Sequence, residues 1–186
     1  MTPLKIVALS GSLRAQSYNT MALRAAATLL PEGVSLEILD YSDVPLYNGD
    51  IHAHGQPAAI ERLRAQIAAA DGLLIASPEY NFSVAGVLKN AIDWLSKAAP
   101  AQPFKNKPTA IISATTGPLG GARSQYDLRK IMASIEAIVM PKPEIFIGNS
   151  ATRFQDGKLV DEATAKLLQA QMTAFRDWML RWRAGA

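Results

Sequence analysis

The sequence predicts an α/β protein in which a doubly wound, five-stranded parallel sheet is covered by helices on both faces, giving a three-layer α/β/α sandwich. Short apolar segments alternate with segments of helical periodicity along all 186 residues. The apolar segments lack the polar alternation of a strand with one solvated face, which indicates parallel strands buried on both sides. Helices between successive strands supply the crossovers that a parallel sheet requires. Since no linker or repeat interrupts this pattern, we expect residues 1–186 to form a single domain.

The first half of the chain contains three of the predicted strands. In order, we expect a strand at 4–9, a helix at 18–30, a strand at 34–39, a helix at 58–69 and a strand at 72–77. Pro31 and Gly33 end the first helix, because the residue before a proline avoids the helical conformation and glycine tolerates tight turns. Residues 40–57 form a long connection rich in Asp, Gly, Pro and Asn, which is typical of a loop.

The second half continues the alternation and ends in a long helix. We expect a helix at 84–98, a strand at 108–114, a helix at 122–135, a short strand at 137–140, an extended piece at 144–147 and a helix at 161–183. The final helix carries an apolar stripe, which is typical of core or subunit packing rather than of a cofactor site. The stripe consists of Leu167, Leu168, Met172, Phe175, Trp178, Met179 and Trp182.

Composition excludes several classes of function. The chain is 49% hydrophobic and 19% charged, as a globular protein is, and it has no cysteine for disulfides, thiolate metal sites or a cysteine nucleophile. Its net charge of +3 is spread along the sequence, so we expect no nucleic-acid binding, which needs a concentrated basic stripe. The two histidines, His52 and His54, lie in the long connection without clustered carboxylates, so we expect no metal site.

The sequence carries no pattern that indicates a membrane or export. No apolar run approaches the roughly 20 residues that cross a bilayer, so we expect no membrane span. The first residues, MTPLK, run into a strand pattern and lack the basic and apolar regions of a signal peptide. We therefore expect a cytoplasmic protein.

The loop at 10–19, between the first strand and the first helix, has the composition of a phosphate site. Ligands of an open parallel sheet bind beyond the carboxyl ends of its strands, and free N–H groups at a helix start favour an anion. The candidate cofactor-binding residues here are Ser10, Ser12, Arg14, Ser17 and Asn19. The loop matches neither the Walker A nor the dinucleotide pattern, which favours a mononucleotide. The alternative is that the serines only turn the chain and cap the helix.

Two further loops follow the third and fourth strands. The loop at 77–86 combines proline with aromatic side chains, which suits a flat heterocycle, although Ser83 as a simple helix cap is an alternative. Its candidate residues are Pro78, Glu79, Tyr80, Asn81 and Ser83. The loop at 115–123 has three glycines in five positions, which permit close approach of a ligand to the backbone, unless it is a flexible connector. The candidates here are Ser113, Thr116, Gly117, Gly120 and Gly121.

Together these loops resemble those of the NADPH-dependent FMN reductase family, and in particular its chromate and quinone reductase branch. The resemblance covers nearly the whole chain. It rests on the sequences LSGSLR at 9–14, PEYNFS at 78–83, KNAIDW at 89–94 and GPLGGAR at 117–123, with Ser17 and Asn19. Each motif alone is weak, but their combination in this order is specific.

The resemblance implies a flavodoxin-like fold, non-covalently bound FMN and reduction by NADPH or NADH. By that resemblance Ser12, Arg14, Ser17 and Asn19 hold the phosphate, residues 78–83 line the ring, and Ser113 and 116–121 approach its pyrimidine side. The implied acceptors are small molecules such as quinones or chromate, and the implied assembly is a homodimer or homotetramer. The interface candidates are Arg123, Tyr126 and Glu144. We predict no catalytic acid or base, because hydride transfer is the cofactor's own chemistry.

Three other functions remain open at this point. A flavodoxin-type electron carrier would bind FMN without NAD(P)H turnover, although such carriers are strongly acidic and this chain is slightly basic. A flavin-free domain could bind another mononucleotide or a phosphosugar. A response-regulator-like domain would need an acidic cluster after the first strand, where Ser10, Gly11 and Ser12 stand instead.

Overall fold

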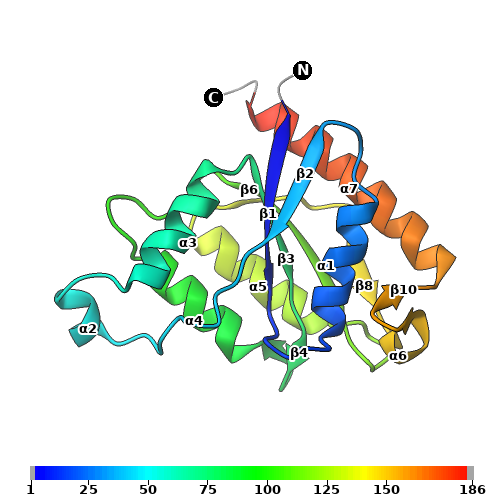
Figure 1. Ribbon diagram of the computed structural model, residues 1–186, viewed down its shortest axis with the longest axis horizontal. Coiled ribbons are helices and arrows are strands. Elements are labelled where there is room, and N and C mark those ends of the chain that lie inside the picture. The colour runs from blue at the N-terminus through cyan, green and yellow to red at the C-terminus, as the bar shows by residue number, and fades with distance from the viewer. Residues whose placement is uncertain (1–2, 184–186) are drawn as a thin grey trace.

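The computed structural model describes residues 3–183 and shows a parallel sheet between two layers of helices (Figure 1). The strands of the sheet are β1 (Leu4–Ser10), β2 (Val34–Ile38), β3 (Gly72–Ala76), β6 (Pro108–Ala114), β7 (Ile138–Val139) and β8 (Ile145–Ile147). They are parallel and follow the order β2-β1-β3-β6-β7, with β8 also paired to β6. This order, which reverses direction at β1, confirms the predicted doubly wound α/β fold class.

Helices cover both faces of the sheet, which lies nearly edge-on in Figure 1. One face packs against α1 (Tyr18–Thr28) and α7 (Glu162–Arg183), and the other against α3 (Ala58–Ala69), α4 (Gly86–Leu95) and α5 (Ala122–Ser134). The smaller elements are α2 (Gly49–Ala53), α6 (Ser150–Arg153) and two hairpins, β4 (Glu79–Tyr80) with β5 (Ser83–Val84) and β9 (Phe154–Gln155) with β10 (Lys158–Leu159). No helix within residues 3–183 is long and apolar enough to cross a membrane.

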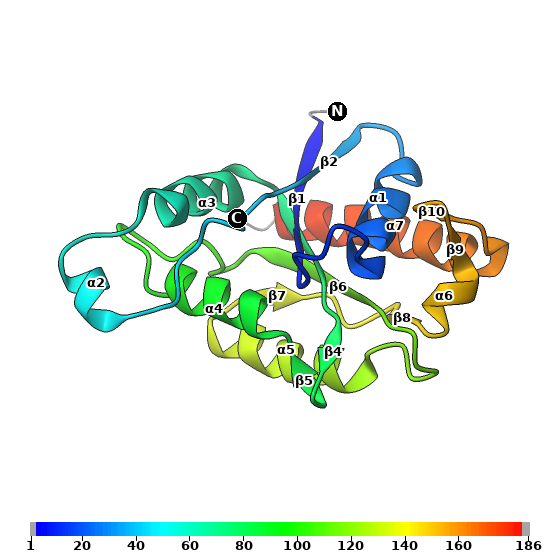
Figure 2. The same cartoon turned by 60° about the horizontal axis from the view of Figure 1, so that its bottom comes forward.

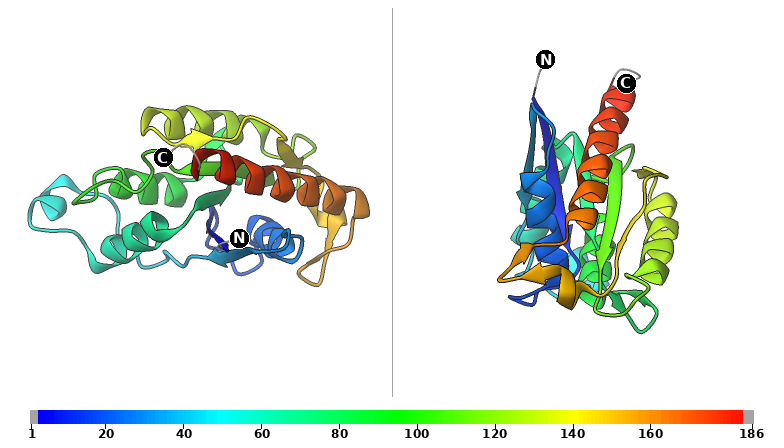
Figure 3. Two further views of the ribbon diagram at one scale, coloured as in Figure 1. Left: turned by 90° about the horizontal axis from the view of Figure 1, so that it is seen from above. Right: turned by 90° about the vertical axis from the view of Figure 1, so that its right-hand side faces the viewer.

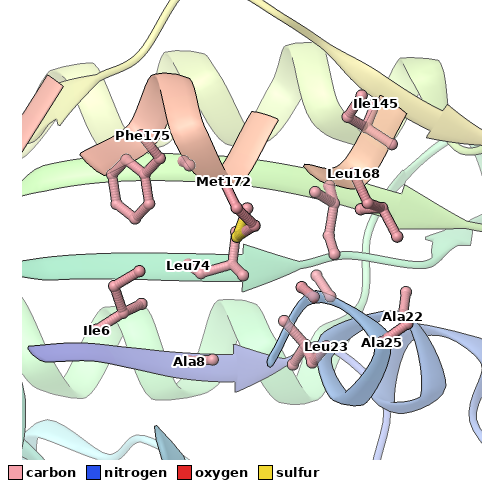
Figure 4. Packing of buried hydrophobic residues seen from close by; sticks show 14 of the residues in the cluster. Ile6, Ala8, Ala22, Leu23, Ala25, Leu74, Ile145, Leu168, Met172 and Phe175 are labelled. Carbon is pink, nitrogen blue, oxygen red and sulfur yellow. The ribbon is translucent and has the colours of Figure 1, made fainter. Parts of the chain in front are cut away.

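The apolar stripe of α7 forms part of the core between the sheet and α1. Figure 4 shows Leu168, Met172 and Phe175 packed over Ile6 and Leu74 of the strands. The fully buried members follow helical spacing, which leaves the side chains at the margins of the stripe facing solvent. Leu167, which is 55% exposed, and Trp182, which is 41% exposed, lie at these margins and do not belong to the core of the single chain.

The fifth strand position is divided between two short strands. β7 pairs with the beginning of β6 and β8 with its end, so the expected strand at 137–140 and extended piece at 144–147 share one position. Between them, the buried side chain of Gln171 on α7 donates to the Ile111 carbonyl, 3.1 Å away, and to the Pro143 carbonyl, 3.0 Å away. A helix side chain thus replaces hydrogen bonds at the break in the ladder.

The long connection after β2 is fastened to α4. Asn90 and Trp94 both donate to the Pro45 carbonyl, at 2.8 and 2.9 Å, and the Tyr47 N–H donates to the Asn90 side chain at 2.8 Å. The connection contains the short helix α2, which the sequence did not predict. Part of the KNAIDW motif therefore holds a distant loop in place.

Candidate functional site

A cleft opens at the carboxyl edge of the sheet, at the bottom of Figure 1, where the loops after β1, β3 and β6 meet. β1 begins and α7 ends at the opposite edge (Figure 3). The cleft is lined by Ser12, Arg14, Ser17, Tyr18, Asn19, Pro78, Glu79, Tyr80, Ala114, Thr115 and Thr116. All three loops selected from the sequence contribute to this lining.

Hydrogen bonds and close packing fix the shape of the first loop, residues 10–19. The Ser10 hydroxyl is buried, donates to the Ser12 carbonyl at 3.2 Å and lies 2.8 Å from the Thr20 hydroxyl. The Gly11 N–H donates to the Ala76 carbonyl of β3 at 2.7 Å. A Cβ at Gly11 would lie 2.6 Å from the Pro78 ring, so only glycine permits this approach. The turn is therefore held rigidly between β1 and β3.

The start of α1 supplies the donors that an anion requires. Ser17 caps the helix by accepting from the Thr20 N–H at 3.4 Å, as the alternative interpretation expected. The N–H groups of Tyr18 and Asn19 lie in the first turn, where no carbonyl of the helix can accept them. Among residues 3–183, no carboxylate forms an ion pair with Arg14. These groups at one end of the cleft fit a phosphate.

Asn19 joins the first loop to the third. Its buried amide donates to the Ala114 carbonyl at 2.9 Å and accepts from the Ala114 N–H at 3.0 Å. The start of α1 is thus tied to the end of β6, on the other side of the cleft. Asn19 lines the cleft, and the two hydrogen bonds of its amide hold the first and third loops in register.

The second loop is the hairpin β4–β5, which lies beside α5 (Figure 2). Its two turn residues, Asn81 and Phe82, have φ angles of 50° and 69°, as in the mirror-image turns that connect tight hairpins. Glycine is usual at the second of these positions, so Phe82 is strained there. The ring of Phe82 is exposed and lies 3.8 Å beneath the guanidinium of Arg123.

Two polar contacts attach the hairpin to α5. Arg123 forms an ion pair with Glu79 at 2.7 Å, and its N–H donates to the same carboxylate at 3.1 Å. The Ser83 hydroxyl donates to Asp127 at 2.8 Å. The Lys130 ammonium, and after it the Ser83 hydroxyl, lowers the pKa of Asp127. Because α4 begins after Ala85, the interpretation of Ser83 as a helix cap was wrong.

Two glycines of the third loop pack closely against other residues of the same chain. A Cβ at Gly120 would lie 2.6 Å from the backbone of Phe146, and one at Gly121 would lie 2.8 Å from Ser113; both glycines have positive φ. The Ser113 hydroxyl donates to the Gly120 carbonyl and accepts from Gln125 at 2.8 Å. These contacts hold the loop against β8 and explain why glycine is needed.

The structure thus divides the predicted site residues into two groups. Those that line the cleft are Ser12, Arg14, Ser17, Asn19, Pro78, Glu79, Tyr80 and Thr116. Those that lie outside its lining are Ser10, Asn81, Ser83, Ser113, Gly117, Gly120 and Gly121. The lining residues that the sequence did not single out are Tyr18, Ala114 and Thr115. Each of these three adjoins a predicted residue, and that adjacency is the signal that would have found them.

The residues described contain no group of three or more metal-ligating side chains. His54 is exposed, and the ring of His52 packs against Trp94, 6.0 Å away between centroids. Neither histidine contributes to the lining of the cleft.

Comparison with known proteins gives consistent matches across the chain. A family model described as NADPH-dependent FMN reductase matches residues 4–152. An NAD(P)H-dependent FMN reductase of Pseudomonas aeruginosa is 48% identical over 181 residues, which cover 97% of each chain. A quinone reductase of Escherichia coli is 43% identical over 182 residues, which cover 96% of each chain. The structure of FerB, a flavoenzyme NAD(P)H:(acceptor) oxidoreductase from Paracoccus denitrificans, matches with a TM-score of 0.87 at 33% identity, covering 96% of this chain and 98% of that one.

Proposed function

Because this chain belongs to the NADPH-dependent FMN reductase family, we propose that it transfers hydride from NADPH or NADH through bound FMN to quinones. The observation that carries the proposal is the cleft itself. It combines a helix start with free donors at one end and a proline- and tyrosine-bearing loop along one side. A phosphate suits the first feature and a flat ring suits the second.

In this proposal each wall of the cleft contacts a different part of FMN. Arg14, Ser12 and the first N–H groups of α1 bind the phosphate, and the guanidinium supplies the countercharge. Pro78 and Tyr80 limit the positions open to the ring. Thr116, on the opposite wall, offers donors to the polar edge of the ring. When bound, FMN supplies the hydride chemistry, so we assign no residue of this chain as an acid or base.

The acceptor class follows from the open form of the site and from the names of relatives. Quinone reduction is the activity named for the relative from Escherichia coli and for the NADPH:quinone oxidoreductase of Arabidopsis thaliana, which is 42% identical over 185 residues. We propose quinones as the primary acceptors and chromate as a further one. We further propose that the chain is a single domain, that it acts in the cytoplasm, and that it forms a homodimer or homotetramer through a surface that includes Arg123, Tyr126 and Glu144.

Anaerobic titration tests the proposed function directly. The purified holoprotein is mixed with NADPH and, separately, with NADH, and the absorbance of the oxidised flavin is followed. We expect rapid bleaching, then recovery when a benzoquinone is added. Initial rates at several quinone concentrations should give parallel reciprocal plots, because donor and acceptor use one site in turn. A flavin that neither pyridine nucleotide bleaches would support the electron-carrier alternative instead. A purified protein without any flavin, and unable to bind added FMN, would overturn both.

A further inference from the structure

Tyr41 lies just beyond the end of β2, in the long connection, and its side chain points back under the first loop. The residue is 3% exposed and packs in the apolar cluster between the sheet and α3 and α4. Its hydroxyl donates to the backbone carbonyl of Ser10, the last residue of β1. No role was predicted for this residue from the sequence. It lies outside the lining of the cleft described above, but it lines a neighbouring pocket together with Ser10, Ser12 and Arg14.

The contact occupies the place of a missing backbone hydrogen bond. β1 and β2 pair in parallel register up to Ala8 and Ile38, and the Leu39 N–H donates to the Ala8 carbonyl at 2.9 Å. In a parallel ladder the next donor to β1 would be the N–H of residue 41, and its acceptor would be the carbonyl of Ser10. The chain instead turns at Asp40, whose carboxylate accepts from the Ser42 N–H at 2.9 Å. The side chain of Tyr41 therefore continues the ladder after the backbone has left it.

Two hydrogen bonds of Ser10 hold the beginning of the first loop in place. Its carbonyl is held by Tyr41, and its hydroxyl donates to the Ser12 carbonyl. Ser12 in turn lines the cleft, and its hydroxyl lies 3.4 Å from the N–H of Arg14. Two hydrogen bonds, of 3.2 and 3.4 Å, thus connect Ser10 to the residues proposed to bind the phosphate.

We propose that Tyr41 is a positioning residue for the phosphate end of the cofactor site, acting through Ser10 and Ser12. This inference rests on the proposed function, because it presumes that FMN binds with its phosphate at the first loop. Without the hydroxyl, the buried Ser10 carbonyl would lack its donor, and the loop would relax away from the geometry that binds the phosphate. Burial raises the pKa of Tyr41 above its ordinary value, so the hydroxyl keeps the proton that it donates.

The test compares two ligands that differ only in the phosphate. FMN and riboflavin are titrated into apoprotein of the wild type and of Tyr41→Phe, with flavin fluorescence as the readout. We expect FMN affinity to fall about tenfold, as the loss of one donor to a buried acceptor implies. Riboflavin affinity should stay within about twofold of the wild type, since the ring end of the cleft is unchanged. The kcat of the variant at saturating FMN should also stay near the wild-type value.

Tyr47→Phe is the matched control. It removes a tyrosine hydroxyl from the same connection, but the ring of Tyr47 packs on Trp94, with 4.9 Å between the ring centroids, and its hydroxyl has no hydrogen bond to Ser10 among those described. This control should leave both affinities unchanged. If Tyr41→Phe does not fold, Tyr41→Met, which also lacks the donor, is measured in the same way.

The outcomes separate this inference from the proposed function. Unchanged FMN affinity in the variant, or an equal fall for FMN and riboflavin, would overturn the role of Tyr41. A wild type that binds FMN no better than riboflavin would overturn the proposed function, and this inference with it. A fall for FMN alone, with the control unaffected, supports both.

Discussion

The first loop and the hairpin β4–β5 form neighbouring walls of one cleft, yet they are held by different kinds of contact. The first loop relies on backbone groups and buried hydroxyls, such as those of Ser10 and Ser17. The hairpin relies on charged side chains of α5, namely Arg123 and Asp127, that lie partly in solvent. Buried neutral contacts persist across pH and salt, whereas half-exposed ion pairs are weak and screened. We therefore expect the first loop, proposed to bind the phosphate, to be the rigid wall of the cleft, and the hairpin, proposed to contact the ring, to be the more mobile wall.

We expect the largest effect of a substitution at Asn19, which lies in the rigid wall of the cleft. Asn19→Leu keeps the size of the side chain but removes both hydrogen bonds to Ala114. Two buried backbone groups would lose their partners, so we expect the free energy of unfolding to fall by about 2–4 kcal/mol. Urea denaturation of the apoprotein measures this loss. Asn48→Ala, which removes the cap of the short exposed helix α2, is the control and should cost about 1 kcal/mol or less.

Arg14 tests whether the rigid wall holds the phosphate. Arg14→Ala removes a guanidinium that has no ion pair among the described residues, so the fold should be unaffected. We expect FMN affinity to fall about 10- to 100-fold, with riboflavin affinity and kcat at saturating FMN near wild type. Arg181→Ala, which removes an exposed guanidinium near the end of α7, at the edge of the sheet opposite the cleft, is the matched control. A fall in kcat with FMN fully bound would contradict a role limited to phosphate binding.

Glu79 tests the mobile wall. Glu79→Gln weakens the ion pair with Arg123 while keeping the size of the side chain. We expect FMN and riboflavin affinities to fall together by about two- to fivefold, because the change acts at the ring end and the Arg123 partner is 41% exposed. Fluorescence titration of both ligands measures this. Glu136→Gln, which breaks an exposed pair with Lys105 away from the cleft, should change neither affinity. A loss confined to FMN would show that the two walls do not divide the ligand as proposed.

The contrast between local contacts and contacts far apart in the sequence determines which features could be predicted from the sequence. The start of α1 was predicted because its determinant is local: Ser17 caps the helix three residues before Thr20. The contact that requires glycine at position 11 was not predicted, because Pro78 is 67 positions away in the sequence. The order and type of the main helices and strands were predicted from hydrophobic periodicity, which is also a local property of the sequence. The hairpin was missed because its contacts to α5 join residues 44 positions apart, such as Ser83 and Asp127. The positive φ of Phe82 is equally invisible in composition.

The divided fifth strand and the third loop show the same limit. A periodic pattern cannot show that Gln171 of α7 reaches the Ile111 carbonyl, because these residues are 60 positions apart. The glycines at 120 and 121 were expected to permit close approach of a ligand to the backbone. What approaches them, however, is Phe146 and Ser113 of the same chain, and only a structure identifies that partner.

Acid should affect the mobile wall and leave the rigid wall intact. The pKa of Asp127 is lowered by the Lys130 ammonium and then by the Ser83 hydroxyl. A carboxyl whose pKa in the fold lies below its unfolded value of about 3.9 contributes stability that is complete above that pH. The contribution is lost as the pH falls through the folded pKa. No titrating carboxyl holds Ser10 or Ser17 in the hydrogen bonds described for the first loop.

Asp127→Asn measures this effect, which should be the smallest of the series because the carboxylate is partly exposed, at 33%. We expect the wild type to be slightly more stable than the variant near neutral pH, with the difference shrinking below about pH 4. Urea denaturation at a series of pH values follows the difference. Ser83→Ala removes only the weaker of the two contacts, so it should retain part of the pH dependence. A stability difference that stays constant from neutral to acidic pH would mean that Asp127 acts through its shape rather than its charge, and the hairpin would then be held as rigidly as the loop beside it.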